Sequence, residues 1–171
     1  MRAIFLVGFM ASGKSSVGRE LARRLDWDFE DLDVLIEARE GQTIPEMFRD
    51  RGENGFRLAE TGALRDLVSE PLNETSALNR VVALGGGAFV QAANRELLRP
   101  WPTVFLAAPV SELWQRSQTD GIARPLRGNF DQFAQLYAGR LPFYRQASMI
   151  VETAGKPLAS ICIEIENALQ L

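Results

Sequence analysis

The chain has 171 residues, of which 46% are hydrophobic and 24% charged, and it carries a net charge of -3 with no histidine. This length fits one domain with a sizeable core, so we expect a single domain over residues 1–171. The sequence has no basic run of the kind that tracks nucleic acid, so a nucleic-acid partner is not expected and any anion site must be local. The absence of histidine excludes histidine bases and histidine-containing zinc sites.

The first apolar run, residues 3–7, leads directly into a glycine-rich motif. It is too short for a signal segment or a membrane span, so we expect a buried strand and no membrane partner. The single cysteine, Cys162, excludes an intramolecular disulfide and is typical of a protein in a reducing cytoplasm. We therefore expect a cytoplasmic location.

Strand-like and helical patterns alternate along the chain. Strands are predicted over residues 3–7, 81–84, 103–107 and 149–151, with a weaker one over 29–32. Helices are predicted over residues 15–25, 55–68, 110–117 and 130–137, with a last helix that has Pro157 in its first turn. This alternation predicts an α/β fold with a parallel sheet covered by helices on both faces.

Two polar segments interrupt the pattern, at residues 69–80 and 119–130. The first gives no functional indication. The second carries Arg124 and Arg127 beside glycine and proline, and it is long enough to form a lid.

Residues 8–15 read GFMASGKS and match the phosphate-binding pattern G-x-x-x-x-G-K-[ST]. Gly8 and Gly13 permit backbone angles that turn N–H groups toward a phosphate, and the helix that follows directs its positive end to the same anion. Lys14 can reach the β- and γ-phosphates, and the Ser15 hydroxyl can bind Mg²⁺. The motif predicts a nucleotide site but leaves the reaction open, because GTPases, transport ATPases and metabolite kinases all carry one.

Two aspartates, Asp31 and Asp33, follow the predicted second strand. Ligands of an open parallel sheet bind beyond the carboxyl ends of its strands, so both side chains can face the phosphates. One could orient Mg²⁺ through water, and the other could accept a hydroxyl proton. A solvated acidic loop is an equally good interpretation of this spacing.

At this point the sequence resembles the shikimate kinase family over nearly its whole length, in several separate motifs. These motifs are the phosphate loop GFMASGKSSVG, Phe29-Glu-Asp31-Leu-Asp33, Gly52-Glu53-x-x-Phe56-Arg57-x-x-Glu60, Leu84-Gly85-Gly86-Gly87, Arg124-Pro125-Leu126 and Arg140-x-Pro142-Phe143-Tyr144. Ala11 stands where the family commonly has glycine, Ser16 where it has threonine, and Phe143 where leucine is usual.

The resemblance implies a three-layer α/β/α sandwich with a five-stranded parallel sheet, and a monomer that uses ATP and Mg²⁺ to phosphorylate the 3-hydroxyl of shikimate. It implies that Asp33 holds the shikimate hydroxyls and is the candidate base, while Arg57 and Arg140 bind the carboxylate. Gly86 and Gly87 would contact shikimate through the backbone. The implied ATP-binding residues are Gly8, Ala11, Ser12, Gly13, Lys14, Ser15, Ser16, Arg116 and Arg124. Of these, Lys14 and Arg124 would also act in catalysis, and Ser15 with Asp31 would serve the metal.

Simpler interpretations exist for single residues. Alone, Arg57 reads as a solvated helix arginine paired with Glu53 or Glu60, and Arg140 as surface charge at a helix end. The triple glycine alone reads as a tight turn. The nearest rival function is another metabolite kinase, such as a gluconate kinase, but two arginines suit a carboxylate on a rigid ring. A non-catalytic sensor is a further alternative, although the residues that such a protein would lose are all present.

Overall fold

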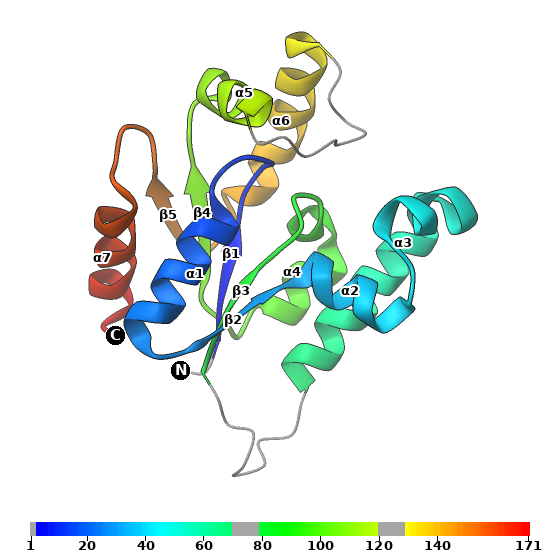
Figure 1. Cartoon of the computed structure of the whole chain (residues 1–171), viewed down its shortest axis with the longest axis horizontal. Helices are drawn as coiled ribbons and strands as arrows, with labels where there is room; N and C mark the ends of the chain where they lie inside the picture. Colours follow the sequence, from blue (N-terminus) through cyan, green and yellow to red (C-terminus); the bar gives the residue numbers. More distant parts are fainter. Residues whose placement is uncertain (1–2, 70–78, 120–128) are drawn as a thin grey trace.

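The computed structural model describes residues 3–69, 79–119 and 129–171, which form five strands, seven α-helices and one short 3-10 helix (Figure 1). None of the helices in this described part combines the length and apolarity that crossing a membrane requires. In chain order the elements are β1 (Ala3–Val7), α1 (Lys14–Leu25), β2 (Asp28–Asp31), α2 (Leu32–Glu40), α3 (Ile44–Ser69), β3 (Arg80–Ala83), η1 (Ala88–Val90), α4 (Ala92–Leu98), β4 (Thr103–Ala107), α5 (Val110–Thr119), α6 (Phe130–Tyr144), β5 (Met149–Glu152) and α7 (Leu158–Leu169).

The five strands form one sheet in the order β2-β3-β1-β4-β5, and every neighbouring pair is parallel. Central strand β1 pairs on both sides, with Phe5 opposite Val82 in β3 and opposite Thr103 in β4. The predicted five-stranded parallel sheet is therefore confirmed. Because all strands run the same way, the segments that follow them meet at one edge, the upper edge in Figure 1.

Helices cover both faces of the sheet, which gives the three layers implied by the family resemblance (Figure 1). Side chains of β1 alternate: Ile4 and Leu6 pack in a core with α1 and α7, whereas Phe5 and Val7 pack in a larger core with α2, α3 and α4. All four side chains are almost fully buried, as expected for a central parallel strand. Cys162 lies in the first of these cores as a buried apolar residue.

Helices α2 and α4 are not among the predicted helices, and the weak strand predicted over residues 29–32 is wrong at its last residue. Leu32 begins α2 instead of ending β2. The reason is a helix cap: the Asp31 carboxylate accepts a hydrogen bond from the Asp33 N–H at 3.1 Å. Leu32 is fully buried in this position, so its apolar side chain packs in the core from the helix, as it would have done from a strand.

Differences at two other helices bear on Arg140 and Pro157. Helix α6 extends to Tyr144, well past the predicted end at residue 137, and it continues through Pro142. Arg140 therefore lies inside a helix and not at its end, which corrects the simpler interpretation of that residue. Helix α7 begins at Leu158 with Pro157 as its extended N-cap residue, not in its first turn.

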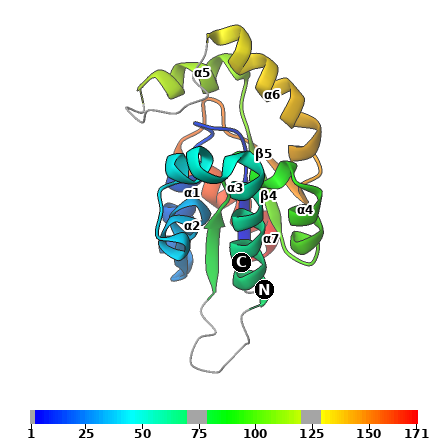
Figure 2. The ribbon, with the colours of Figure 1, turned by 90° about the vertical axis from the view of Figure 1, so that its right-hand side faces the viewer.

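Helix α3 is bent at Gly52, and only its second part overlaps the predicted helix over residues 55–68. The backbone of Gly52 has φ 69° and ψ −179°, a conformation that only glycine adopts readily. In Figure 2 the parts of α3 before and after this bend run in clearly different directions. The bend determines the direction of the second part of α3, which carries Arg57 and Glu60.

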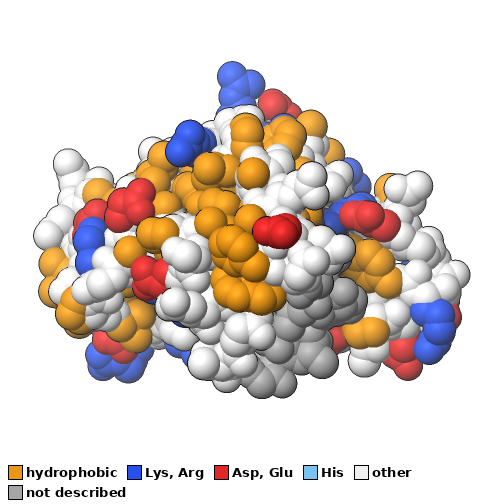
Figure 3. Space-filling view, turned by 90° about the horizontal axis from the view of Figure 1, so that it is seen from above, with side chains coloured by type: hydrophobic (Ala, Val, Ile, Leu, Met, Phe, Trp, Pro, Cys, Tyr) orange, Lys and Arg blue, Asp and Glu red, His pale blue; other side chains and the backbone are white. Residues whose placement is uncertain are grey.

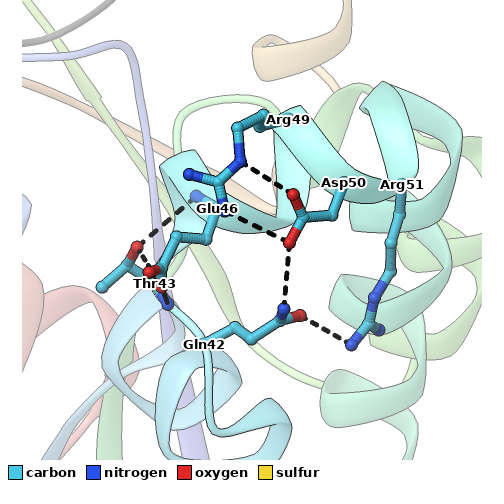
Figure 4. A network of polar contacts seen from close by, with 6 residues as sticks. All are labelled: Gln42, Thr43, Glu46, Arg49, Asp50 and Arg51. Atoms are coloured by element: carbon cyan, nitrogen blue, oxygen red, sulfur yellow. Dashed lines mark hydrogen bonds and ion pairs between the residues drawn. The ribbon is translucent and has the colours of Figure 1, made fainter.

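The connection from α2 into α3 is held by a network of polar contacts (Figure 4). Thr43 and Glu46 form a capping pair, because the Glu46 carboxylate accepts hydrogen bonds from both the N–H and the hydroxyl of Thr43 at 2.8 Å. Gln42 donates to Asp50 at 3.2 Å and accepts from Arg51 at 2.8 Å. These contacts fix the first part of α3 against the end of α2.

Candidate active site

The phosphate loop follows β1 at the carboxyl edge and leads into α1, as its motif predicts. Two of its glycines have positive φ angles, 155° at Gly8 and 91° at Gly13. The ammonium group of Lys14 donates to the carbonyls of Gly8 at 3.0 Å and Phe9 at 2.9 Å. Lys14 is thus folded back over the loop, where its ammonium group can contact the oxygens of a bound phosphate.

The other residues of the loop differ in exposure. Ser15 and Ser16 are exposed in the first turn of α1. Ser12 is buried, and its hydroxyl has no hydrogen-bond partner among the described residues. Ala11 has φ 60°, in the left-handed region that favours glycine.

The structure brings Ser15 and Asp31 together, as predicted for a metal site. The Ser15 hydroxyl donates to Asp31 Oδ2 at 3.1 Å, while the other oxygen of Asp31 caps α2. Among the described residues there is no group of three or more His, Cys, Asp or Glu side chains that could enclose a metal. Mg²⁺ in kinases takes one or two protein oxygens together with waters and phosphates, so this pair of hard oxygen donors fits it.

The glycine turn, residues 85–87, follows β3 and brings three charged side chains together. A methyl group on its first residue would lie 2.6 Å from Asp33 Oδ1, and one on its third residue would lie 2.7 Å from Arg57 Nη1. A methyl group on its middle residue would lie 3.7 Å from Arg140 Nη1. A side chain at either outer position would displace Asp33 or Arg57, so glycine lets these two charged groups lie directly against the turn. Three helices, α2, α3 and α6, therefore converge on this turn.

The Arg57 guanidinium is held by a buried ion pair. Its Nη1 donates to both oxygens of Glu60 at 3.0 and 2.9 Å, and its Nη2 lies 3.3 Å from Glu53. Its side chain is only 16% exposed, so it is not the solvated arginine of the simpler interpretation, although both expected partners are present. Burial raises the pKa of Glu60 to about 7, against the smaller opposing effect of Arg57.

Arg140 reaches the same turn from α6. Its Nη1 donates to the Gly86 carbonyl at 3.2 Å, and its guanidinium lies 5.8 Å from the centre of the Phe9 ring. Phe9 belongs to the phosphate loop, so Arg140 contacts both the loop and the glycine turn. Tyr144 also donates to the Gly86 carbonyl, a contact that sequence reasoning did not single out. Its spacing of four residues from Arg140 is the signal that could have revealed it, because such residues share a helix face.

The remaining predicted residues are less well defined. Arg116 lies on α5 and pairs with Glu112, one helical turn earlier. Arg124 and Arg127, with most of the lid predicted over residues 119–130, fall outside the described residues. Most of the polar segment over residues 69–80 does so as well.

Figure 3 shows the molecule from above, the side of the carboxyl edge, where acidic and basic side chains of the described residues are interspersed among hydrophobic ones. The described residues on this face therefore form no broad basic surface, and the charged groups of the candidate site act locally.

Comparison with known proteins identifies the family. The family model described as shikimate kinase matches residues 10–170. A shikimate kinase of Halorhodospira halophila is 44% identical over 98% of this chain and 93% of its own length. The solved structure of a shikimate kinase from Acinetobacter baumannii in complex with shikimate has 36% identity and a TM-score of 0.87, covering 99% of this chain and 94% of that one. The shikimate kinase from Bacteroides thetaiotaomicron has 33% identity and a TM-score of 0.88, covering 99% of both chains.

The match extends over nearly the whole chain, in sequence and in fold, and it includes the phosphate loop, the glycine turn and the segments that carry Asp33, Arg57 and Arg140. The chain therefore belongs to the shikimate kinase family.

Proposed function

We propose that this protein transfers the γ-phosphate of ATP to the 3-hydroxyl of shikimate, giving shikimate 3-phosphate and ADP. The observation that carries the proposal is the convergence of Asp33, Arg57 and Arg140 on the glycine turn, directly beside the phosphate loop. Shikimate is a carboxylate with three hydroxyl groups on a ring. A site for it needs guanidinium groups for the carboxylate and a carboxylate for the hydroxyls, and these three residues supply both.

In this proposal Arg57 and Arg140 bind the acceptor carboxylate. Each guanidinium is fixed on one side by protein contacts, Arg57 by Glu60 and Arg140 by the Gly86 carbonyl. A planar fork that is already fixed loses little freedom when it binds a second anion. Gly86 and Gly87 let the backbone of the turn approach the ring closely.

Asp33 binds the reacting hydroxyl and accepts its proton. The hydroxyl oxygen forms a bond to the γ-phosphorus, the bond from that phosphorus to the β–γ bridging oxygen breaks, and ADP leaves. Asp33 sits beside Gly85 and two residues after Asp31, whose side chain contacts Ser15 of the phosphate loop. This arrangement supports an acceptor hydroxyl held next to the bound nucleotide.

The phosphate loop binds ATP in this proposal, and Lys14 balances charge on the transferring phosphoryl group. Ser15 would hold Mg²⁺, and Asp31 would orient it through water. When bound, Mg²⁺ neutralises charge on the β- and γ-phosphates. The proposed nucleotide contacts are Gly8, Ala11, Ser12, Gly13, Lys14, Ser15, Ser16, Arg116 and Arg124.

Several expectations from the sequence stay predictions. They are a single domain over residues 1–171 with a lid at about 119–130, a monomer, a cytoplasmic location and the lack of a nucleic-acid partner. Arg124 would close over the transferring phosphate, and Arg116 would lie near adenine.

The test is ADP release from Mg-ATP, coupled to NADH oxidation, with shikimate, quinate or gluconate as acceptor. Shikimate should accelerate ADP release far above the rate without acceptor, and gluconate should not, because it lacks the rigid ring that two fixed guanidinium groups suit. The product should carry one phosphate on its 3-hydroxyl, as seen by phosphorus and proton NMR. Acceleration by gluconate but not by shikimate would overturn the proposal.

A further inference from the structure

The carbonyl of Gly86 accepts hydrogen bonds from two side chains of the same helix, the Tyr144 hydroxyl and the Arg140 guanidinium. We propose that Tyr144 is a positioning residue for the acceptor, because its hydroxyl fixes the glycine turn and, through their shared carbonyl, the Arg140 guanidinium. The inference rests on the proposed function, since it concerns how the same acceptor site is held.

The glycine turn cannot hold its own conformation by side-chain packing. Glycine has more backbone freedom than any other residue, and here three stand in a row. A backbone hydrogen bond from the Ala88 N–H to the Gly85 carbonyl at 3.0 Å closes the turn, so contacts from outside it must fix the peptide planes in between. Asp33 and Arg57 lie against its two outer residues, but both are charged groups that the acceptor itself engages in the proposed function. Tyr144 is uncharged and buried, so it can hold the turn whether or not an acceptor is bound.

The orientation of one peptide plane decides what the turn presents to a ligand. No cis peptide occurs in the described residues, so the Gly86 carbonyl and the Gly87 N–H point in opposite directions. Tyr144 and Arg140 hold that carbonyl toward α6. The Gly87 N–H is thereby directed away from α6. Without the tyrosine hydroxyl, only Arg140 would hold the peptide plane between Gly86 and Gly87. Arg140 would then have to bind the Gly86 carbonyl and the acceptor carboxylate at the same time.

Tyr144 is itself fixed by the sheet and by the segment after the turn. Its ring lies 5.3 Å from that of Phe105 in β4, and its side chain is fully buried. The neighbouring Phe143 ring lies 4.9 Å from the guanidinium of Arg95, which donates to the carbonyls of Phe89 and Val90 at 2.9 and 2.7 Å. The end of α6 is therefore docked on η1, directly after the glycine turn. Burial raises the pKa of Tyr144 to about 12, so the hydroxyl stays a donor over the pH range of an assay.

The chain offers a matched control, because its only other tyrosine, Tyr137, lies on the same helix. The Tyr137 hydroxyl also donates to a backbone carbonyl, that of Ala108 at 3.2 Å, which is not part of the glycine turn. Tyr144→Phe and Tyr137→Phe thus each remove one hydroxyl and keep the ring and its packing. Steady-state kinetics of both variants should be measured against shikimate and against ATP, with Arg140→Lys as a reference for direct loss of acceptor binding.

Tyr144→Phe should raise the KM for shikimate by about threefold to tenfold, the factor expected for one hydrogen bond. Its KM for ATP should stay at the wild-type value. Tyr137→Phe should show no such selective rise. Hydrogen exchange should also be faster at residues 85–88 in Tyr144→Phe than in Tyr137→Phe, because the turn closed by the Ala88 N–H and the Gly85 carbonyl loses one of its outside contacts.

Two results would overturn the inference. One is a shikimate KM in Tyr144→Phe equal to that of Tyr137→Phe, together with unchanged exchange at residues 85–88. The other is a parallel loss for shikimate and ATP, which would mark a general structural role. The proposed function fails separately, if the wild-type protein does not phosphorylate shikimate at all. If wild type does so and Arg140→Lys raises the shikimate KM while Tyr144→Phe does not, only the role of Tyr144 is wrong.

Discussion

The phosphate loop and the acceptor region are built in opposite ways. The loop is a continuous stretch of eight residues whose conformation depends on its own backbone, with positive φ angles at Gly8, Ala11 and Gly13. The acceptor region is assembled from α2, α3, α6 and the turn after β3, and the turn contributes almost no side-chain atoms of its own. A local motif can therefore reveal the first region, whereas only the fold creates the second.

The two regions also differ in how their charges are held. Ser15 and Ser16 of the loop are exposed, as suits a site that a large, highly charged nucleotide enters. In the acceptor region Glu60 is fully buried, and Arg57 is only partly exposed. Buried charges that are already paired can discriminate between acceptors, because a ligand that fails to satisfy them leaves an uncompensated group. Nucleotide binding and acceptor choice should therefore respond to different substitutions.

The largest effect is expected in the phosphate loop. Lys14→Ala should abolish ADP release both with and without shikimate, because it removes the charge that serves the phosphates in either reaction. The protein should keep its fold, which circular dichroism and thermal unfolding will check. A folded variant with near-normal turnover would contradict the assignment of the loop as the nucleotide site.

Substitution of Asp33 should separate the two regions. Asp33→Asn keeps the shape and removes the charge, so kcat with shikimate should fall by about 10²- to 10⁴-fold, the usual share of a general base. Slow ATP hydrolysis without acceptor should stay largely intact. A rise in the KM for shikimate with a smaller loss of kcat would show instead that Asp33 positions the hydroxyl without accepting its proton.

Asp28→Asn is the matched control, because Asp28 is exposed at the opposite end of β2. It should behave as wild type in both assays. If both variants phosphorylate shikimate like the wild-type protein, the acceptor region lies elsewhere and the comparison between the two regions fails.

The third prediction concerns Glu60, whose pKa burial raises from the ordinary 4.5 to about 7. Between these values the folded protein binds a proton that the unfolded chain releases, so this group favours folding below pH 4.5 and loses that contribution as pH rises to about 7. The free energy of unfolding of wild type relative to Glu60→Gln should therefore fall across this window, by as much as about 3 kcal/mol. Urea unfolding at each pH measures this difference.

Taking the difference between the two proteins cancels the exposed carboxylates, such as Glu46 and Glu166, whose lowered pKa values give the opposite pH dependence. A difference that stays constant with pH, or that rises, would mean that Arg57 keeps Glu60 ionised throughout.

Much of the fold could be predicted from the sequence because its signals are local. The strand over residues 3–7, the motif over 8–15 and the alternation of strands and helices all appear in continuous stretches. Helix α2 was missed because its start depends on one cap, the contact from Asp31 to the Asp33 N–H. The first part of α3 was missed because Gly52 looks like a helix end, whereas here it only bends the helix.

The candidate site divides in the same way. For Arg57 and Arg140, spacing alone favoured ordinary surface charge, and only the family resemblance indicated a shared ligand. Their convergence on the glycine turn depends on contacts between segments more than 25 residues apart in the chain, for example the 54 residues that separate Arg140 from Gly86. Local patterns contain no information on such contacts, so the spacing could place Tyr144 on the same helix face as Arg140 but could not show that both side chains meet the Gly86 carbonyl.

A smaller effect is expected at the bend of α3. Gly52→Ala should destabilise the protein by about 1–3 kcal/mol, because φ 69° with ψ −179° is a conformation that a side chain disfavours. Apart from its own helix turn, no atom of the described residues lies within 4 Å of the added methyl group, so the cost is backbone strain and not collision. Gly139→Ala is the control: it lies within α6 with equally open surroundings and should stabilise by about 0.5–1 kcal/mol. Equal shifts in the two unfolding curves would show that Gly52 does not carry this strain.

The smallest effect is expected at Ala11, and it has the opposite sign. Ala11 has φ 60°, and the left-handed conformation costs a residue with a side chain roughly 1–2 kcal/mol. Ala11→Gly removes that cost, but the greater freedom of glycine in the unfolded chain takes back about 0.4–1 kcal/mol. We expect a net stabilisation of about 0.5 kcal/mol, which is about 1–2 °C in Tm for a chain of this size.

The control is Ala138→Gly, in the exposed middle of α6, which should instead destabilise by about 1 kcal/mol. If both substitutions destabilise equally, the phosphate loop does not store strain at Ala11. The conformation of the loop would then not depend on an unusual backbone angle at this residue, and the contrast with the acceptor region would lose one of its observations.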